Sequence, residues 1–247
     1  MAVYTIGDLH LSLLVNKPMD KFGHRWTGYT EKIEKRWRAL VEDGDTVVVP
    51  GDISWAMTLD EAAEDFRFID SLPGRKILGK GNHDYWWTTV TKMKKFLSDI
   101  GISSIDFLQN NAFRVGEGEK QMIICGTRGW FIDEKLQATP NPTDYEKLVS
   151  REVIRLTNSL SEGVKLRRDP DGEESAPIKV FLHFPPVFGD FIVPELIDTM
   201  RSFGVSECFF GHIHGKYSHP QTTVYDGIKF TMISADFIDF YPQKVFR

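Results

Sequence analysis

Five short clusters of aspartate, asparagine and histidine contain the side chains of this sequence that are best suited to chemistry. In chain order they are Asp8-Leu9-His10, Gly51-Asp52, Gly81-Asn82-His83-Asp84, His183 and Gly211-His212-Ile213-His214. Imidazole and carboxylate groups together suit borderline divalent metals such as manganese, iron, zinc, cobalt or nickel better than calcium or magnesium. The clusters therefore predict a site for transition-metal ions.

The number of candidate ligands indicates more than one ion. Five of the seven histidines lie in these clusters, and only His24 and His219 lie elsewhere. Four of the clustered histidines, together with three carboxylate or amide side chains, are too many ligands for one tetrahedral ion. A pair of divalent metal ions that share a bridging ligand would use a set of this size.

Each cluster directly follows a segment with a β-strand pattern. These segments are residues 2–6, 46–49, 76–78, 179–182 and 207–210. Open α/β sheets place their sites in the crevice beyond the carboxyl ends of the strands. Glycines allow the backbone to turn sharply off each strand. We therefore expect five loops, far apart in the sequence, to converge on one site.

Helical patterns alternate with the strand patterns. We expect helices at residues 29–41, 58–72, 88–100, 143–160 and 193–203, two of them opened by the capping boxes Thr58/Glu61 and Thr143/Glu146. Further strands are expected at residues 103–108, 112–115, 121–125, 222–225 and 229–233, and past Ala235. The charged, turn-rich segment 167–177 is expected to form an exposed loop. Since no repeat or linker divides the chain, the pattern predicts one α/β domain over residues 1–247.

Composition narrows the classes of partner. The chain has 247 residues, a formal charge of −5 and no block of five basic residues, so long nucleic acid is not an expected partner. The opening segment MAVYTIGDLH lacks the features of a signal peptide, and no apolar run approaches the ~20 residues of a membrane span. Cys125 and Cys208 lie in apolar, strand-like contexts and are expected to be buried free thiols, which suits the cytoplasm.

The ordered set of clusters resembles the calcineurin-like metallophosphoesterase superfamily, in the form of a bacterial-type predicted phosphohydrolase. The resemblance extends from residue 7 to residue 215, and no ligand position is missing. It implies a four-layer α/β/β/α sandwich of two mixed β-sheets flanked by helices. It also implies a hydrolase of a small-molecule phosphomonoester or phosphodiester, which acts by attack of a metal-bound hydroxide.

The resemblance assigns a role to each polar position. One ion would be held by Asp8, His10, Asp52 and His214, and the second by Asp52, Asn82, His183 and His212. Asp52 would then bridge the two ions. His83 would bind no metal, and would donate a proton to the leaving oxygen or steady the phosphorane. Asp84 is predicted to fix the tautomer of His83, with a turn or helix N-cap residue as the alternative.

Two departures from the protein phosphatase branch put a phosphoprotein substrate in doubt. That branch has Gly-Asn-His-Glu, whereas this chain has Asp84 in the last position. It also has an arginine-containing stretch after its Gly-Asp, whereas Gly51-Asp52 is followed by Ile53-Ser54-Trp55-Ala56-Met57. Monoester and diester cleavage both remain open.

Aromatic residues flank the clusters. Trp55 and Trp86 either pack the loops together or wall a pocket for a planar or apolar leaving group. Arg128, which follows the strand pattern at 121–125, is a candidate contact for the non-bridging phosphate oxygens. Two alternative functions are a nuclease on the same fold and a non-catalytic metal-binding scaffold. The net negative charge of the chain disfavours a nuclease, and the complete set of candidate ligands disfavours a non-catalytic scaffold.

Overall fold

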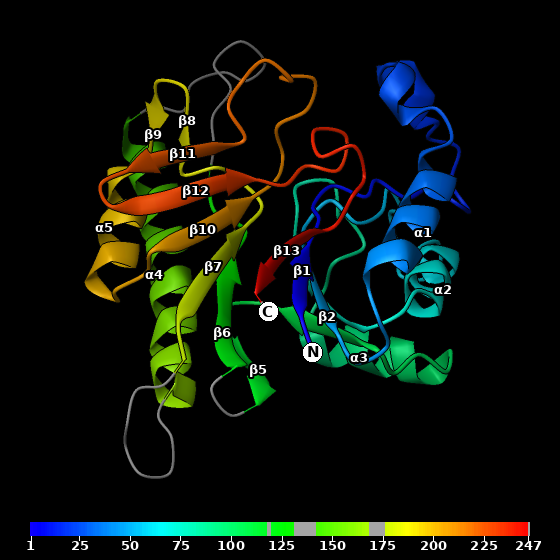
Figure 1. Ribbon diagram of the computed structural model, residues 1–247, viewed down its shortest axis with the longest axis horizontal. Helices are drawn as coiled ribbons and strands as arrows, with labels where there is room; N and C mark the ends of the chain where they lie inside the picture. The colour runs from blue at the N-terminus through cyan, green and yellow to red at the C-terminus, as the bar shows by residue number, and fades with distance from the viewer. Residues whose placement is uncertain (118–119, 131–141, 168–175, 247) are drawn as a thin grey trace.

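The computed structural model of the protein describes residues 1–117, 120–130, 142–167 and 176–246 (Figure 1). Two β-sheets lie face to face, and each is covered by helices on its outer side. The expected four-layer α/β/β/α arrangement is confirmed.

The first sheet contains the strands that precede three of the polar clusters. Its order is β13-β1-β2-β3-β4, and all neighbours are parallel except β13 and β1. Its strands are β1 (Val3–Thr5), β2 (Thr46–Pro50), β3 (Arg75–Gly79), β4 (Ile105–Leu108) and β13 (Gln243–Phe246). Strands β1 and β2 are buried along their whole length, which explains their continuous apolar runs.

The second sheet contains the strands that precede the other two clusters. Its order is β11-β12-β10-β7-β6-β5, with antiparallel pairs only at its two edges. Its strands are β5 (Ala112–Glu117), β6 (Lys120–Thr127), β7 (Ile178–Leu182), β10 (Glu207–Phe210), β11 (Thr222–Tyr225) and β12 (Ile228–Met232). A small hairpin of β8 (Val187–Phe188) and β9 (Phe191–Ile192), which the sequence patterns did not predict, follows β7.

The helices form the two outer layers. Figure 1 shows α1 (Tyr29–Leu40), α2 (Ala63–Ser71) and α3 (Val90–Asp99) outside the first sheet, and α4 (Pro142–Arg167) and α5 (Pro194–Ser202) outside the second. Two short 3₁₀ helices, η1 (Met19–Phe22) and η2 (His24–Trp26), precede α1.

Three hydrophobic clusters hold the layers together. The central cluster lies between the sheets and includes Val48 and Ile77 from the first sheet and Ile124 and Phe181 from the second. The other two clusters join each sheet to its own helices. Both sheets therefore share one buried interface, and their strand ends open at the same edge of the molecule.

Two helices differ from the expected bounds. Thr58 accepts from the Glu61 N–H at 3.3 Å, but the Glu61 side chain accepts from the Met57 N–H rather than from Thr58, so a turn forms here and α2 begins only at Ala63. Helix α4 continues past residue 160 through Gly163, where a Cβ would overlap the Cys125 sulfur. Glycine is thus the residue that lets α4 pack closely on β6. Most of the expected loop at 167–177 lies outside the described residues.

Candidate metal centre

The structure brings all five polar loops to one edge of the two sheets. Asp8 and His10 follow β1, Asp52 follows β2, and Asn82 follows β3, whereas the histidine loops follow β7 and β10 in the other sheet. The backbone of Gly7 joins the sheets, since its N–H donates to Ile233 O at 2.8 Å and its carbonyl accepts from the Ala235 N–H at 3.0 Å. The site therefore straddles the seam between the two sheets.

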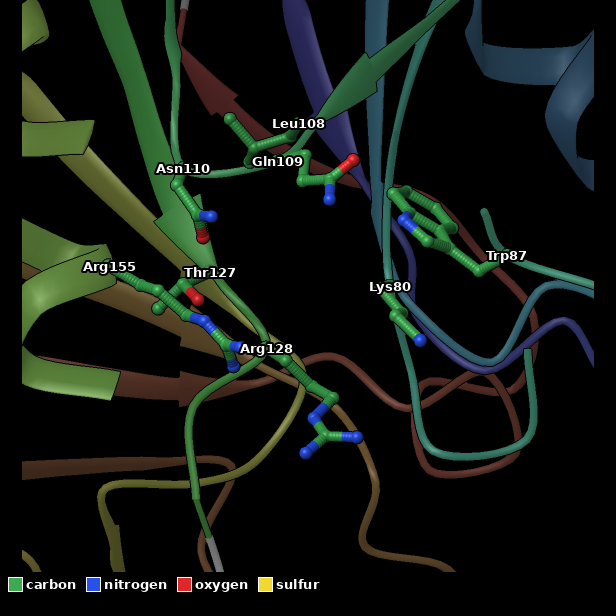
Figure 2. A pocket seen from close by; sticks show the side chains of 8 residues that line it. All are labelled: Lys80, Trp87, Leu108, Gln109, Asn110, Thr127, Arg128 and Arg155. Atoms are coloured by element: carbon green, nitrogen blue, oxygen red, sulfur yellow. The ribbon is translucent and has the colours of Figure 1, made fainter. Parts of the chain in front are cut away.

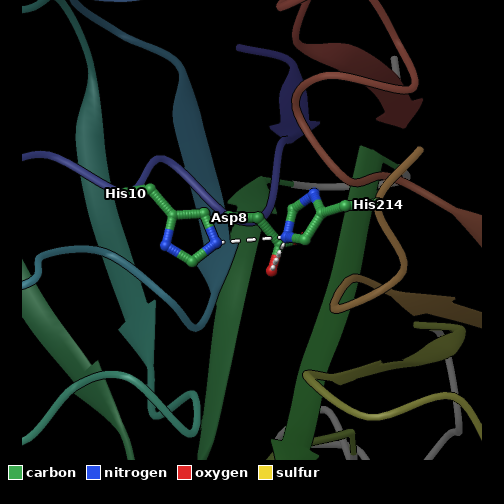
Figure 3. A group of neighbouring side chains, drawn as sticks. All are labelled: Asp8, His10 and His214. Atoms are coloured by element: carbon green, nitrogen blue, oxygen red, sulfur yellow. Dashed lines mark hydrogen bonds and ion pairs between the residues drawn. The ribbon is translucent and has the colours of Figure 1, made fainter. Parts of the chain in front are cut away.

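One group of potential ligands consists of Asp8, His10 and His214 (Figure 3). The Nε2 atoms of His10 and His214 face each other at 3.1 Å. His214 Nε2 lies 3.9 Å from Asp8 Oδ1, and His10 Nε2 lies 3.6 Å from Asp52 Oδ2. The three side chains come from two different sheets yet point at the same spot.

A second group consists of Asp52, His183 and His212. His183 Nε2 lies 3.6 Å from Asp52 Oδ2 and 2.7 Å from Asn82 Oδ1. Asp52 Oδ2 is thus equally distant from a histidine nitrogen of each group. This shared oxygen places Asp52 between the two groups.

These distances fit metal coordination. For metal–nitrogen bonds of about 2.1 Å, the ligand atoms around a tetrahedral ion are separated by about 3.4 Å. The separations between 3.1 and 3.9 Å in the first group bracket that value. The donor set of imidazole nitrogens and carboxylate oxygens is also the one that divalent transition metals prefer.

The electrostatics of the two buried carboxylates, Asp8 and Asp52, also favour a bound cation. Asp8 and Asp52 are buried, and among the described residues neither forms an ion pair with a lysine or arginine. Burial raises the pKa of Asp8 to about 6. Burial, followed by the charges of Asp84 and Asp8, raises the pKa of Asp52 well above its usual range. A bound cation would offset the cost of these buried charges.

Three of the histidines have lowered pKa values, which suits a neutral metal ligand. Burial, with the neighbouring histidines as the lesser cause, lowers the pKa of His10 and His183 well below the usual value and that of His212 to about 3. Each ring is therefore neutral near pH 7 and has a lone pair available for a metal.

His214 differs because it has an acidic partner that the sequence analysis missed. Burial lowers its pKa, but the hydrogen bond from Nδ1 to Asp236 Oδ1 at 2.7 Å and the charge of Asp8 outweigh this, so the net shift is upward. Asp236 also accepts from the Tyr217 hydroxyl at 2.8 Å and the Gly215 N–H at 3.1 Å. This bond holds the His214 ring with Nε2 toward Asp8, as carboxylates behind metal-bound histidines do. Asp236 follows β12, so the strand-end rule applied to that strand could have found it.

The backbone is strained at four of the candidate ligands. Asp8, His10, Asp52 and His212 have φ angles of 59°, 48°, 51° and 69°. For residues other than glycine such conformations cost about 1–3 kcal/mol each, and they cluster at functional sites. The strain is compensated by hydrogen bonds, since the His10 N–H donates to Asp52 O at 2.9 Å and the His212 N–H donates to Asp8 Oδ2 at the same distance.

Asp84 lies beneath the site. Its carboxylate accepts backbone N–H groups from Gly81 at 2.7 Å, Asp52 and Ile53 at 2.9 Å, and Ser54 at 3.2 Å. These bonds tie the loop after β2 to the loop after β3. The geometry favours the turn-residue interpretation of Asp84 over the acid–base partnership with His83.

His83 lies beside the first group of ligands without joining it. Its backbone N–H donates to Asp52 Oδ1 at 2.8 Å, and its ring centroid lies 5.6 Å from that of His10. Burial, then the charges of His214 and Lys17, lower the pKa of His83 to about 4. The ring is therefore neutral near pH 7 and has one N–H to offer as a hydrogen-bond donor.

The three candidate substrate residues have different surroundings. Trp55 stacks on His10 with ring centroids 5.0 Å apart and lines a recess beside His83. Trp86 is 3% exposed and packs edge-to-face on Phe66 in the core, which favours its packing interpretation. Arg128 lines a separate cavity with Lys80 and Arg155.

Comparison with known proteins now identifies the family. The family model described as calcineurin-like phosphoesterase matches residues 1–216, which includes every loop of the site. The chain belongs to the calcineurin-like phosphoesterase family. Members of this family are metal-dependent hydrolases of phosphoesters, and the two ligand groups of this phosphoesterase are its candidate metal-binding clusters.

Solved structures share the fold of this phosphoesterase. The phosphopantetheinyl hydrolase of Mycobacterium tuberculosis is 14% identical, with a TM-score of 0.56 over 99% of this chain and 95% of that one. The protein TT1561 of Thermus thermophilus is 9% identical, with a TM-score of 0.52 over 95% of this chain and 89% of that one. At such identities the likeness shows the fold alone. No curated protein gives a significant match.

A helix that spans a membrane must be both long and predominantly apolar. Within the part of the chain that the structure describes, no helix has the length and apolar content needed to cross a membrane.

Proposed function

We propose that this phosphoesterase binds two divalent cations and hydrolyses a small-molecule phosphomonoester or phosphodiester. Asp8, His10, Asp52 and His214 would hold one cation, and Asp52, Asn82, His183 and His212 the other. The observation that carries the proposal is the single oxygen Asp52 Oδ2, which lies 3.6 Å from His10 Nε2 and from His183 Nε2.

The bound cations would supply a water of lowered pKa as nucleophile and positive charge for the phosphoryl oxygens. The chain's own residues shape the site in which this hydrolysis would take place. Asn82 contributes a neutral amide where a carboxylate would repel the incoming phosphate. Asp84 and Asp236 act as positioning residues, the first through the loop backbone and the second through the His214 ring.

His83 is proposed to act on the leaving oxygen. Its ring lies next to the His10–His214 group, and its Nδ1 is buried without a hydrogen-bond partner among the described residues. The neutral ring can donate a hydrogen bond to that oxygen. An approaching phosphate anion would raise the pKa of His83 from about 4, so that a larger fraction of the rings takes up a proton and can pass it to the leaving oxygen.

The His83→Ala variant tests this role. We expect kcat to fall by roughly 10²–10⁴-fold for alkyl phosphates, because their poor leaving groups need a proton. The loss should be much smaller for p-nitrophenyl esters, whose leaving group departs as an anion. The measurement is kcat across a series of esters graded by leaving-group pKa, with metal content measured in parallel. Equal losses across the series would exclude proton donation by His83.

The recess beside His83, which we call the Trp55 recess, is proposed to hold the leaving group. It has a volume of about 490 Å³, and Met19, Phe22, Trp26 and Trp55 form its apolar wall. The Trp55 ring lies 4.2 Å from the His83 ring, centroid to centroid. A group released next to His83 would therefore meet an aromatic surface, which suits a planar or apolar leaving group.

Phe22 offers a direct test of the Trp55 recess, since it is 68% exposed and its removal should leave the fold intact. We expect Phe22→Ala and Trp55→Ala to raise KM for phenyl and nucleoside phosphates several-fold, and to change KM for methyl phosphate little. Leu14→Ala is the matched control, because Leu14 is 56% exposed and does not line the recess. Unchanged KM values for every aromatic ester in both variants would refute this assignment.

We also propose that the chain acts as one domain in the cytoplasm. The shared core between the two sheets supports the first point. Cys125 and Cys208 support the second, because both are free and buried, and burial raises the pKa of Cys125 to about 12. Unpaired thiols are usual in a reducing compartment.

A further inference from the structure

A second cavity lies at the same edge of the sheets as the metal ligands. It has a volume of about 340 Å³, and none of the seven proposed ligands lines it. Lys80, Arg128 and Arg155 contribute its charged groups, and we call it the cationic cavity. Figure 2 shows Lys80 reaching in from the wall opposite Arg128 and Arg155.

The positive charge of the cationic cavity is only partly compensated. Arg155 pairs with Glu152, whose other oxygen accepts from the Thr127 hydroxyl at 3.0 Å. Lys80 and Arg128 have no ion-pair partner within 4 Å among the described residues. Positive charges held together in a concave site attract an anion.

The cationic cavity adjoins the second group of metal ligands. Lys80 lies two residues before Asn82 on the same loop. The Arg128 carbonyl accepts the N–H groups of His183 at 3.2 Å and Phe184 at 2.8 Å, so the Arg128 loop supports the His183 loop. The Trp55 recess, in contrast, is lined by His10 and His214 of the first group. The two hollows therefore flank different halves of the metal centre.

We propose that the cationic cavity binds a second phosphate group of the substrate, in addition to the phosphate that is hydrolysed. The hydrolysed phosphate must contact the metal ions, and none of the proposed metal ligands lines the cavity, so an anion held there is a separate group. Three cations lining one cavity suit a phosphate group better than a single carboxylate. The inference rests on the proposed function, and it narrows the substrate class to phosphoesters that carry another phosphate.

Phosphate binding without metals tests the cavity apart from catalysis. The EDTA-treated full chain is titrated with inorganic phosphate and with pyrophosphate by calorimetry at pH 8. We expect one site per chain, weakened about tenfold or more in Lys80→Met and retained in Lys80→Arg. Lys94→Met is the control, because Lys94 lies on α3 and pairs with Asp106 away from the cavity. Absence of binding, or equal affinity in Lys80→Met and the unmodified chain, would overturn the proposal.

A substrate comparison separates this inference from the proposed function. The metal-loaded enzyme should have at least about a tenfold higher kcat/KM for adenosine 3′,5′-bisphosphate than for adenosine 5′-monophosphate, and Lys80→Met should lose that preference. Equal kcat/KM values combined with no phosphate binding would remove the cavity's role while hydrolysis stands. Lys80-dependent phosphate binding without hydrolysis of either ester would support the cavity and count against the proposed function.

Discussion

Replacing Asp52 by asparagine is expected to abolish hydrolysis and to weaken the binding of both metal ions. The substitution removes the negative charge of Asp52, whose Oδ2 lies 3.6 Å from a histidine nitrogen of each ligand group. Two-metal centres supply several kcal/mol of transition-state stabilisation, so kcat should fall by at least about 10³-fold. The measurement is metal content per chain after dialysis, by mass spectrometry, together with kcat.

Asp45→Asn is the matched control for Asp52→Asn. Asp45 precedes β2, whereas Asp52 follows it, and both carboxylates are buried and accept backbone N–H groups. Asp45 lies at the opposite end of the strand, so its variant should keep both metals even if stability falls. Two tightly held ions in Asp52→Asn would show that this residue does not bridge the two groups.

The second large effect is expected from Gly81→Ala. A Cβ at residue 81 would overlap both Oδ1 and the backbone nitrogen of Asp52. Asp52 itself has a φ angle of 51°, and its N–H donates to Asp84, so its backbone cannot shift without breaking this hydrogen bond. We therefore expect one added methyl group to displace the Asp52 carboxylate and to reduce both metal affinity and activity strongly. Metal content, kcat and thermal unfolding of the purified variant would be measured together.

Gly44→Ala separates this steric effect from the general cost of replacing a glycine. No atom lies within 4 Å of a Cβ built at residue 44. That variant should therefore retain both metals and full activity. If Gly81→Ala also kept two metals and normal kcat, the close packing of the two loops would not be required for the site.

The convergence of the candidate ligands could be predicted because the residue types and the strand topology indicate the same edge of the sheets. Each buried parallel strand gives a continuous apolar run, and the polar residue after it must lie at the carboxyl edge of a sheet. Asp8 and His183 are 175 residues apart in the sequence, yet His183 Nδ1 lies 3.6 Å from Asp8 Oδ1. The glycines beside the ligands were also recognised, although for Gly81 the reason is close approach of Asp52 rather than a turn.

The supporting residues were harder to predict, because their roles depend on tertiary contacts. Asp84 has the sequence position of an acid–base partner, but its carboxylate is surrounded by four backbone N–H groups from two loops. Trp86 is adjacent in sequence to the site residues, but its ring points into the core, whereas Trp55 faces His10. Neighbouring residues on a loop point in different directions, and no periodic pattern decides which one faces the site.

Metal removal and restoration tests the central claim most directly. The protein would be stripped with EDTA and assayed for hydrolysis of p-nitrophenyl phosphate and bis-p-nitrophenyl phosphate, before and after Mn²⁺ is added, with bound metal counted in parallel. We predict two ions per chain and turnover that is lost on stripping and returns with Mn²⁺, and the preferred ester would distinguish a monoesterase from a diesterase. Failure to bind metal and to hydrolyse either ester would contradict the two-metal account and favour a non-catalytic role for the fold.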